Sequence, residues 1–219
     1  MVKPRFLLST LLLIACAIFA PSVLLADTPA TAPKLEAPSG DYVLDRAHSS
    51  ITFRVLHLGL SFYTARFATF DAKLAFDAAN PEKSSVVVDI KPASIQTDYP
   101  FPERTDFNKD LSTDARWFDT AKYPDANFTS REITRSGPTS FAVQGNLTVR
   151  GITRPVTLDA VLNGSLKAHP FSKRPMLGFS ARTRIKRSDF GMTYLLPSIV
   201  ADEVELIIES EFGNLSQQP

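Results

Sequence analysis

From residue 42 onward, apolar and polar residues alternate with a period of two along most of the chain. In residues 49–57, for example, Ile51, Phe53 and Val55 fall on one face, and polar residues separate them. Strict alternation is typical of strands that bury one face and expose the other. It predicts strands at residues 49–57, 70–76, 84–90, 127–133, 141–149, 154–162, 177–185 and 204–212.

Turn-forming residues such as Asn80-Pro81 separate most of these segments. One wet face per strand indicates antiparallel pairing. Closing about eight such strands into a barrel removes exposed edges and leaves room for one small ligand. Residues 103–119 depart from the alternation, and Ser112 to Asp114 can cap a helical turn there. We therefore expect an all-β fold, an eight-stranded antiparallel barrel with one or two short helices over one end.

The first 26 residues have the layout of a secretory signal peptide. Lys3 and Arg5 precede a nearly unbroken apolar run at residues 6–20, and Ala26 offers a small residue for cleavage. Secretion with cleavage after Ala26 is the main expectation. The alternative is a lipid anchor on Cys16, the single cysteine of the chain, which follows a short run of apolar and small residues.

The remainder divides into a flexible linker at residues 27–40, rich in Pro, Ala and Thr, one domain at residues 41–213 and a disordered tail at residues 214–219. A chain without cysteine after the signal peptide forms no disulfide, which is compatible with a bacterial periplasm. Removing Lys3 and Arg5 from 24 basic residues leaves 22 against 23 acidic residues, a formal charge of −1. Such a balance does not favour nucleic acid as a partner.

The strands and turns carry an ordered set of short motifs that resembles the YceI-like family of bacterial periplasmic proteins over about residues 40–212. The resemblance implies a lipocalin-like barrel that binds polyisoprenoid lipids, such as isoprenoid quinones or polyprenyl phosphates, or long fatty-acid derivatives. It also allows a homodimer. The motifs are DRAHSSITF at 45–53, FATFD at 67–71, FD at 76–77, SIQT at 94–97, WFD at 117–119, YP at 123–124, FTS at 128–130, GNLTVRGITRPV at 145–156, RSDFGM at 187–192 and DEV at 202–204.

Given this resemblance, we expect the apolar chain of a prenyl or acyl lipid to lie among the inward-facing side chains. Trp117 and Phe118 would cover one end, and the polar head would sit near Arg187 or Tyr194. The aromatic, proline-rich residues 98–102 depart from what the family leads us to expect after the SIQT motif and can reshape the mouth. The expected chain-binding residues are Ile51, Phe53, Val55, Phe70, Leu74, Phe76, Val88, Ile90, Phe179, Ile185 and Leu206.

Catalysis and metal binding find little support. A hydrolase would need Asp45, His48 and Ser49 to share a proton, but adjacent residues on a strand point apart. Asp45 and His48 are more simply explained by hydrogen bonds that close a turn. The other histidines, His57 and His169, give no pair with the spacing of a zinc site. We expect no enzyme, no cofactor and no metal.

Two alternatives remain open. Arg187 either faces a polar headgroup or belongs to a plain strand-end turn in which Asp189 accepts backbone N–H bonds. The inward-facing apolar residues either line a tunnel or fill a solid core. A filled core would favour a periplasmic interaction or stress-response module that partners a membrane redox protein.

Overall fold

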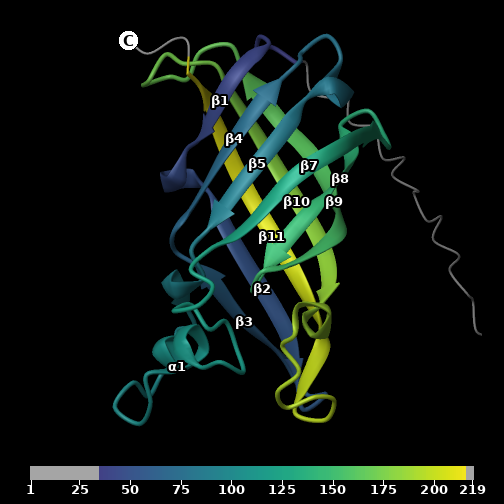
Figure 1. Ribbon diagram of the computed structural model, residues 1–219. Helices are drawn as coiled ribbons and strands as arrows, with labels where there is room; N and C mark the ends of the chain where they lie inside the picture. The colour runs from purple at the N-terminus through teal and green to yellow at the C-terminus, as the bar shows by residue number, and fades with distance from the viewer. Residues whose placement is uncertain (1–34, 216–219) are drawn as a thin grey trace, which may run out of the picture. The chain divides into compact units, whose positions relative to one another are not determined.

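In the computed structural model, which describes residues 35–215, the chain forms one antiparallel sheet that closes into a barrel (Figure 1). The ring follows the order β1-β4-β5-β7-β8-β9-β10-β11, and β11 pairs with β1 to close it. Strands β2, β3 and β6 continue the sheet from β11. The bounds are β1 Gly40–Leu44, β2 Ser50–His57, β3 Ser61–Phe67, β4 Phe70–Phe76, β5 Ser85–Ile90, β6 Ile95–Gln96, β7 Ala126–Arg135, β8 Ser140–Val149, β9 Ile152–Leu166, β10 Met176–Lys186 and β11 Val200–Asn214.

The predicted eight-stranded antiparallel barrel is confirmed, and each predicted strand segment corresponds to β2, β4, β5 or one of β7 to β11. The alternation missed β1, β3 and β6. Strand β3 was hidden because Phe62 stands exposed on its outer face while its inner face begins with Ser61. Strands β1 and β6 are too short to show a period.

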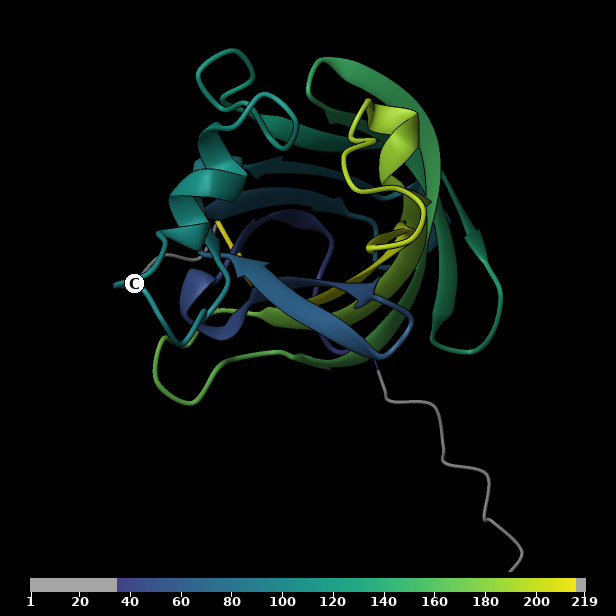
Figure 2. The ribbon, with the colours of Figure 1, turned by 90° about the horizontal axis from the view of Figure 1, so that it is seen from below.

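Hydrogen bonds close the ring at one end only. The C-terminal end of β11 pairs with β1, whereas residues 204–209 pair with β2. A short 3-10 turn, Arg46–His48, separates β1 from β2. Strand β6 pairs with β3 only at Arg66 and Phe67, so toward the tip of the β2–β3 hairpin the sheet ends at β3. The connection from β6 to β7 lies at this end (Figure 2). One end of the barrel is therefore a continuous sheet, and the other is completed by irregular chain.

The expected short helix is present in that connection as α1, Phe107–Thr113, but the predicted cap was wrong, because Ser112 to Asp114 lie at the C-terminal end of α1. Asp106 caps it by accepting a hydrogen bond from the backbone N–H of Lys109 at 3.0 Å. Leu111 is buried and fixes the helix against the barrel interior. None of the helices within residues 35–215 has the length and apolar character needed to cross a membrane.

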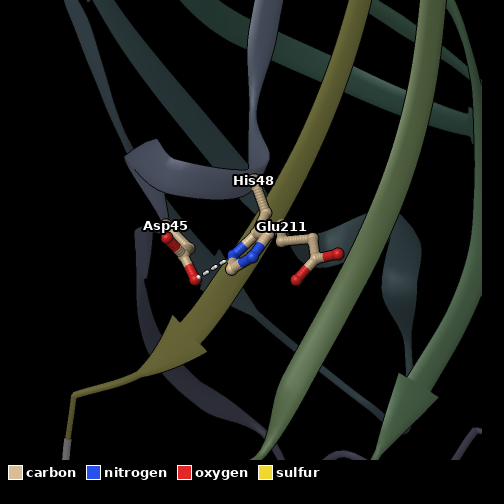
Figure 3. Close-up of side chains that lie close together, drawn as sticks. All are labelled: Asp45, His48 and Glu211. Atoms are coloured by element: carbon tan, nitrogen blue, oxygen red, sulfur yellow. Dashed lines mark hydrogen bonds and ion pairs between the residues drawn. The ribbon is translucent and has the colours of Figure 1, made fainter.

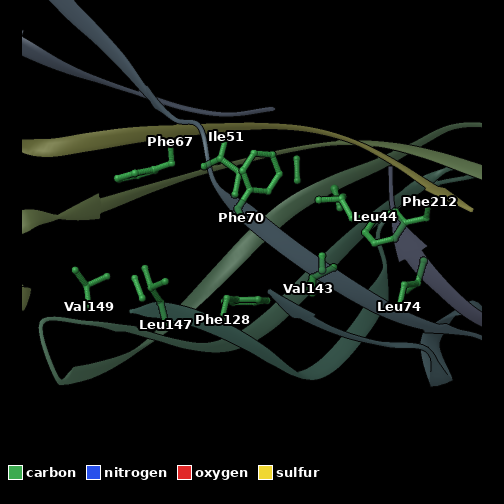
Figure 4. Close-up of a cluster of buried hydrophobic side chains, with 14 of the residues drawn as sticks. Leu44, Ile51, Phe67, Phe70, Leu74, Phe128, Val143, Leu147, Val149 and Phe212 are labelled. Carbon is green, nitrogen blue, oxygen red and sulfur yellow. The ribbon is translucent and has the colours of Figure 1, made fainter. Parts of the chain in front are cut away.

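Alternation places the large apolar side chains inside the ring (Figure 4). In β4, for example, Phe70, Leu74 and Phe76 are buried while the residues between them face outward. Gly145 of β8 leaves room for the ring of Phe128, because a Cβ there would stand 2.3 Å from the Cζ of that ring. Within residues 35–215, the strands and the buried core lie between residues 37 and 214, so this part of the chain has a core of its own.

The first and last strands mark the ends of the barrel. Strand β1 begins at Gly40, and β11 ends at Asn214, which is buried. Each end therefore extends one residue beyond the predicted range 41–213. The predicted signal peptide and most of the predicted linker and tail lie outside the described residues.

Candidate functional site

The barrel holds a narrow chamber of about 160 Å³ at the end where the ring is closed. Inward-facing residues of the eight ring strands and Ile51 of β2 line most of it, and nearly all of them are aliphatic or aromatic. Small residues at Ala72, Ala160 and Ala181 keep its bore open between larger neighbours. None of the described residues that line this chamber is charged, so it suits a hydrocarbon chain and disfavours a polar group.

A wide chamber of about 700 Å³ occupies the other end. This volume falls within the roughly 300–1,000 Å³ typical of small-molecule sites. Its walls come from β2, β3, α1 and the loops that follow α1 and β10. Most of the lining is apolar, but Asp110, Asp114, Arg116 and the exposed His57 also contribute. Among the described residues, charged side chains therefore meet the cavity only at this end.

The two chambers adjoin inside the barrel, because Ile51, Ile90, Leu147 and Leu206 line both. These residues come from β2, β5, β8 and β11, which surround the middle of the barrel. A long flexible molecule can therefore extend from the wide chamber into the narrow one.

Each of the fifteen residues expected to contact a lipid lines one chamber or both, although lipid contact itself stays a prediction. Alternation indicated the eleven that lie on strands, because it identifies the inner face of each strand, and the other four were expected from the family resemblance. It missed lining residues such as Tyr63 on β3 and Phe107 on α1, where no alternation was visible. The narrow chamber takes Phe70, Leu74, Phe76, Val88 and Phe179, the wide one Phe53, Val55, Trp117, Phe118, Ile185, Arg187 and Tyr194, and both take Ile51, Ile90 and Leu206.

Arg187 is only 4% exposed and holds the loop that follows β10. Its guanidinium donates hydrogen bonds to the backbone carbonyls of Met192 at 2.8 Å, Val200 at 2.9 Å and Ala201 at 2.9 Å. Burial lowers the pKa of Arg187, and the charge of Asp202 partly offsets this effect. Arg187 thus shapes the wide chamber through the loop that it fixes.

The plain interpretation of the Arg187 turn was wrong in one respect. The carboxylate that accepts the backbone N–H of Ser188, at 2.9 Å, belongs to Asp202 on β11 and not to Asp189. The other oxygen of Asp202 accepts the Ser188 hydroxyl at 2.7 Å. Asp202 lies far away in sequence, so local spacing gave no indication of it.

Aromatic rings cover part of the wide chamber. Trp117 meets Tyr194 edge to face with ring centroids 5.6 Å apart, and the guanidinium of Arg116 stacks 4.0 Å over the Tyr194 ring. Hydrogen bonds from Arg116 lower the pKa of Asp114 to about 2. This carboxylate is therefore charged at neutral pH, and the rim presents a fixed ion pair beside an apolar interior.

Asp45, His48 and Glu211 cluster on the outside of the barrel (Figure 3). His48 Nδ1 lies 2.9 Å from an Asp45 carboxylate oxygen, and Asp45 also caps the turn by accepting the N–H of Ala47 at 3.0 Å. The hydroxyl of Ser49 donates to the Asp45 carbonyl at 2.7 Å. Its proton is thus directed to the backbone, which leaves no triad here. One nitrogen and two carboxylates within 4.8 Å of one another are potential cation ligands, and spacing alone did not reveal Glu211.

The family model of the YceI-like domain matches residues 42–212, which is nearly the whole barrel. The chain belongs to the YceI-like family. Among curated relatives, protein YceI of Escherichia coli O6:H1 is 38% identical over 178 residues, which cover 80% of this chain and 87% of that protein. The resemblance seen in the motifs is therefore confirmed.

Solved structures agree with the YceI-like fold. BcnA of Burkholderia cenocepacia superposes with a TM-score of 0.65 at 27% identity, covering 77% of this chain and 98% of that one. A polyisoprenoid binding domain from Saccharophagus degradans has a TM-score of 0.55 at 15% identity, covering 83% and 99%. The latter likeness concerns the fold alone.

The departure at residues 98–102 lies at the wide chamber of this YceI-like barrel. Tyr99 lines the chamber, and its ring contacts those of Phe101 and Phe107 at centroid distances of 5.9 Å and 5.6 Å. Tyr99 therefore belongs to the wall of the mouth, and Phe101 packs against it from outside the lining.

Proposed function

We propose that this YceI-like protein is a periplasmic binding protein that holds a long apolar lipid, a polyisoprenoid or an isoprenoid quinone, inside its barrel. The observation that carries the proposal is the pair of adjoining chambers, one narrow and free of charge, the other wide and bordered by polar groups. A molecule with a long hydrocarbon chain and a larger polar head matches this division.

The binding free energy would come from burial of the lipid chain. Each Å² of apolar surface removed from water contributes roughly 25 cal/mol before the entropy of ordering the chain is subtracted. The polar head would stay in the wide chamber, where Arg116, Asp114 and Tyr99 offer hydrogen-bonding groups. Arg187 would act on the head indirectly, because three of its N–H groups already bind carbonyls.

The comparison with relatives supports a lipid as cargo. The Saccharophagus degradans domain, which shares the fold, is described as a polyisoprenoid binding domain. By analogy we assign the same class of ligand to this chain. A filled interior would have favoured an interaction module with a membrane redox partner, so the two chambers favour the carrier over that alternative.

We further propose that the protein binds without catalysis and acts in the periplasm. The first part is supported by the Ser49 hydroxyl, which donates to a backbone carbonyl and lacks an aligned base. The second part rests on the charged start, apolar run and small cleavage residue of the first 26 residues. N-terminal sequencing of the protein from a periplasmic extract tests the location, with Asp27 as the expected first residue.

Two neighbouring valines on β5 test the binding site. Val88 lines the narrow chamber, whereas Val87 faces outward and is 40% exposed. Delipidated protein is titrated with a fluorescent ligand, either a long-chain prenyl alcohol or a polyene fatty acid. We expect Val88→Asp to abolish binding because it places a charge in the chain-binding bore, and Val87→Asp to bind like wild type.

Because Val88→Asp can also weaken folding, Val88→Phe provides a second variant that fills the bore without adding charge. It is expected to fold and to bind long chains more weakly. Unchanged affinity in folded Val88→Asp and Val88→Phe proteins would contradict the assignment of the cavity.

A further inference from the structure

Apolar side chains gather on the surface at the wide end of the barrel. Leu60 is 82% exposed at the tip of the β2–β3 hairpin, and Leu58 and Phe62 beside it are each at least half exposed. Ile199 adds to them from the loop after β10. The N–H of Leu58 donates to the carbonyl of Ile199 at 2.8 Å, so hairpin tip and loop lie side by side (Figure 2). We call these four residues the apolar tip.

Charge is absent from both segments that form the apolar tip. Neither residues 55–65 nor residues 190–201 contain an Asp, Glu, Lys or Arg. On the α1 side of the same mouth, by contrast, Asp110, Asp114 and Arg116 line the wide chamber. The segments that form one side of the mouth are therefore uncharged, with Arg54 of β2 stacked 4.7 Å over the Phe62 ring, whereas the other side is lined by charged residues.

The backbone at the apolar tip is held in a conformation that leucine rarely adopts. Leu58 has a φ of 51° and Gly59 a φ of 69°, and the N–H of Leu60 donates to the carbonyl of His57 at 2.9 Å. This is a tight hairpin turn whose first central position normally favours Asn, Asp or Gly. Leu195, in the adjoining loop, also has a positive φ of 63°. Strained positions of this kind cluster at functional sites.

The apolar tip also borders the cavity. Ile199, Leu195 and His57 line the wide chamber, and Ile199 belongs at the same time to the exposed tip. A continuous apolar path therefore leads from the surface into the barrel. The cargo of the proposed function, on which this step rests, is almost insoluble in water and must come from a membrane.

We propose that the apolar tip inserts into the surface of a lipid bilayer, so that cargo passes between the membrane and the wide chamber without crossing water. Leu58, Leu60 and Phe62 enter the boundary between headgroups and acyl chains, and the charged α1 side stays in the aqueous phase. Because the tip carries no basic cluster, binding relies on apolar burial and is insensitive to salt.

The test is flotation of residues 27–219 with phosphatidylcholine vesicles on a density gradient. This range contains the whole described core and excludes the apolar run at residues 6–20, which would bind vesicles by itself. We expect wild type to float and Leu60→Asp to lose roughly ten-fold or more in partitioning. Phe171→Asp is the matched control, because Phe171 is 88% exposed in the β9–β10 loop at the opposite end (Figure 1).

Leu58→Asn guards against a folding artefact. It gives the turn the Asn-Gly pair that this geometry favours, so the variant should be at least as stable as wild type and still bind vesicles more weakly. The proposal is overturned if wild type does not float, if both tip variants float like wild type, or if Phe171→Asp falls equally. A wild-type dimer that Leu60→Asp separates, with no vesicle binding, would assign the tip to a second copy and also overturn it.

Bound lipid is measured on the same samples by native mass spectrometry. Cargo retained in Leu60→Asp with flotation lost supports both proposals. If wild type holds cargo but does not float, the docking proposal is removed and the carrier proposal is kept. If wild type floats through the apolar tip but never holds cargo, the docking proposal is kept and the carrier proposal is removed.

Discussion

The two ends of the cavity are built in different ways. At the narrow end, eight strands form a closed ring, and the bore is set by backbone hydrogen bonds and by alternating side chains. At the wide end the sheet stops at β3, and α1, the loop after it and the loop after β10 complete the wall. Side-chain contacts hold these segments in place: Arg187 fixes the loop after β10, and Arg150 donates a hydrogen bond to the Ala115 carbonyl in the loop after α1. The regular sheet thus provides a constant bore for a chain, and the irregular segments provide a mouth that sequence changes can reshape.

The largest effect is expected at Arg187, because the mouth depends on it. Arg187→Met removes three hydrogen bonds and leaves the carbonyls of residues 192, 200 and 201 without their donor. We expect the free energy of unfolding to fall by roughly 3 kcal/mol or more. Urea denaturation measures it.

Arg184→Met is the control for Arg187→Met, since Arg184 forms an exposed ion pair with Glu203 at 3.5 Å. It should change the stability by no more than about 0.5 kcal/mol. Equal stability of the two variants would mean that the mouth is held by something other than Arg187.

At the narrow end, the closest packing lies at Gly145. A Cβ there would stand 2.3 Å from the Phe128 ring and 2.5 Å from the Thr129 carbonyl oxygen. Gly145→Ala should therefore lower the stability by roughly 1–3 kcal/mol in the same urea experiment. In Gly164→Ala the new Cβ meets nothing within 4 Å, so that variant should lose little or nothing. If Gly145→Ala is as stable as wild type, the ring of strands can widen at this point.

The length of the bound lipid chain distinguishes the roles of the two chambers. Ala72 lines the narrow chamber from β4, whereas Ala75 on the same strand faces outward. Ala72→Phe should weaken binding of long prenyl chains by roughly ten-fold or more and spare ligands short enough for the wide chamber. Ala75→Phe should bind both like wild type. Titration with prenyl alcohols of increasing length checks this, and an equal loss at all lengths in Ala72→Phe would contradict the division.

The smallest effect on stability is expected from the His48–Asp45 pair on the outside of the barrel. The hydrogen bond to Asp45 raises the pKa of His48 above its usual value of 6.5 and lowers that of Asp45 below 3.8. The contribution of His48 to stability is full below pH 6.5 and is lost as the pH rises through its raised pKa. That of Asp45 is present above pH 3.8 and is lost as the pH falls through its lowered pKa.

NMR titration of His48 tests this pair, and Asp45→Asn should bring its pKa back toward 6.5. An unchanged pKa in Asp45→Asn would show that another group, such as Glu211, sets the titration of His48. Lipid binding in the barrel interior should be unaffected by this exterior variant.

The alternation of the sequence predicted the barrel and the inner face of each long strand, because a period of two fixes which side chains point inward. It could not predict β3 or β6, whose patterns are too irregular or too short. It also could not predict the mouth, because its contacts form only in the folded chain. There Arg187 binds the carbonyls of residues 192, 200 and 201, and Asp202, not Asp189, accepts the N–H of Ser188. Alternation thus predicted the part of the site that the sheet builds, and the family resemblance indicated Trp117, Phe118, Arg187 and Tyr194 at the mouth, but the contacts that hold the mouth were not predictable.

The most direct test of the carrier is native mass spectrometry of the protein purified from the periplasm of the cells that produce it, followed by organic extraction. We predict a bound species that dissociates as one apolar molecule and extracts as a prenyl or quinone lipid. A bare polypeptide mass in every preparation, with no extractable lipid, would contradict the proposal that the two chambers hold a lipid.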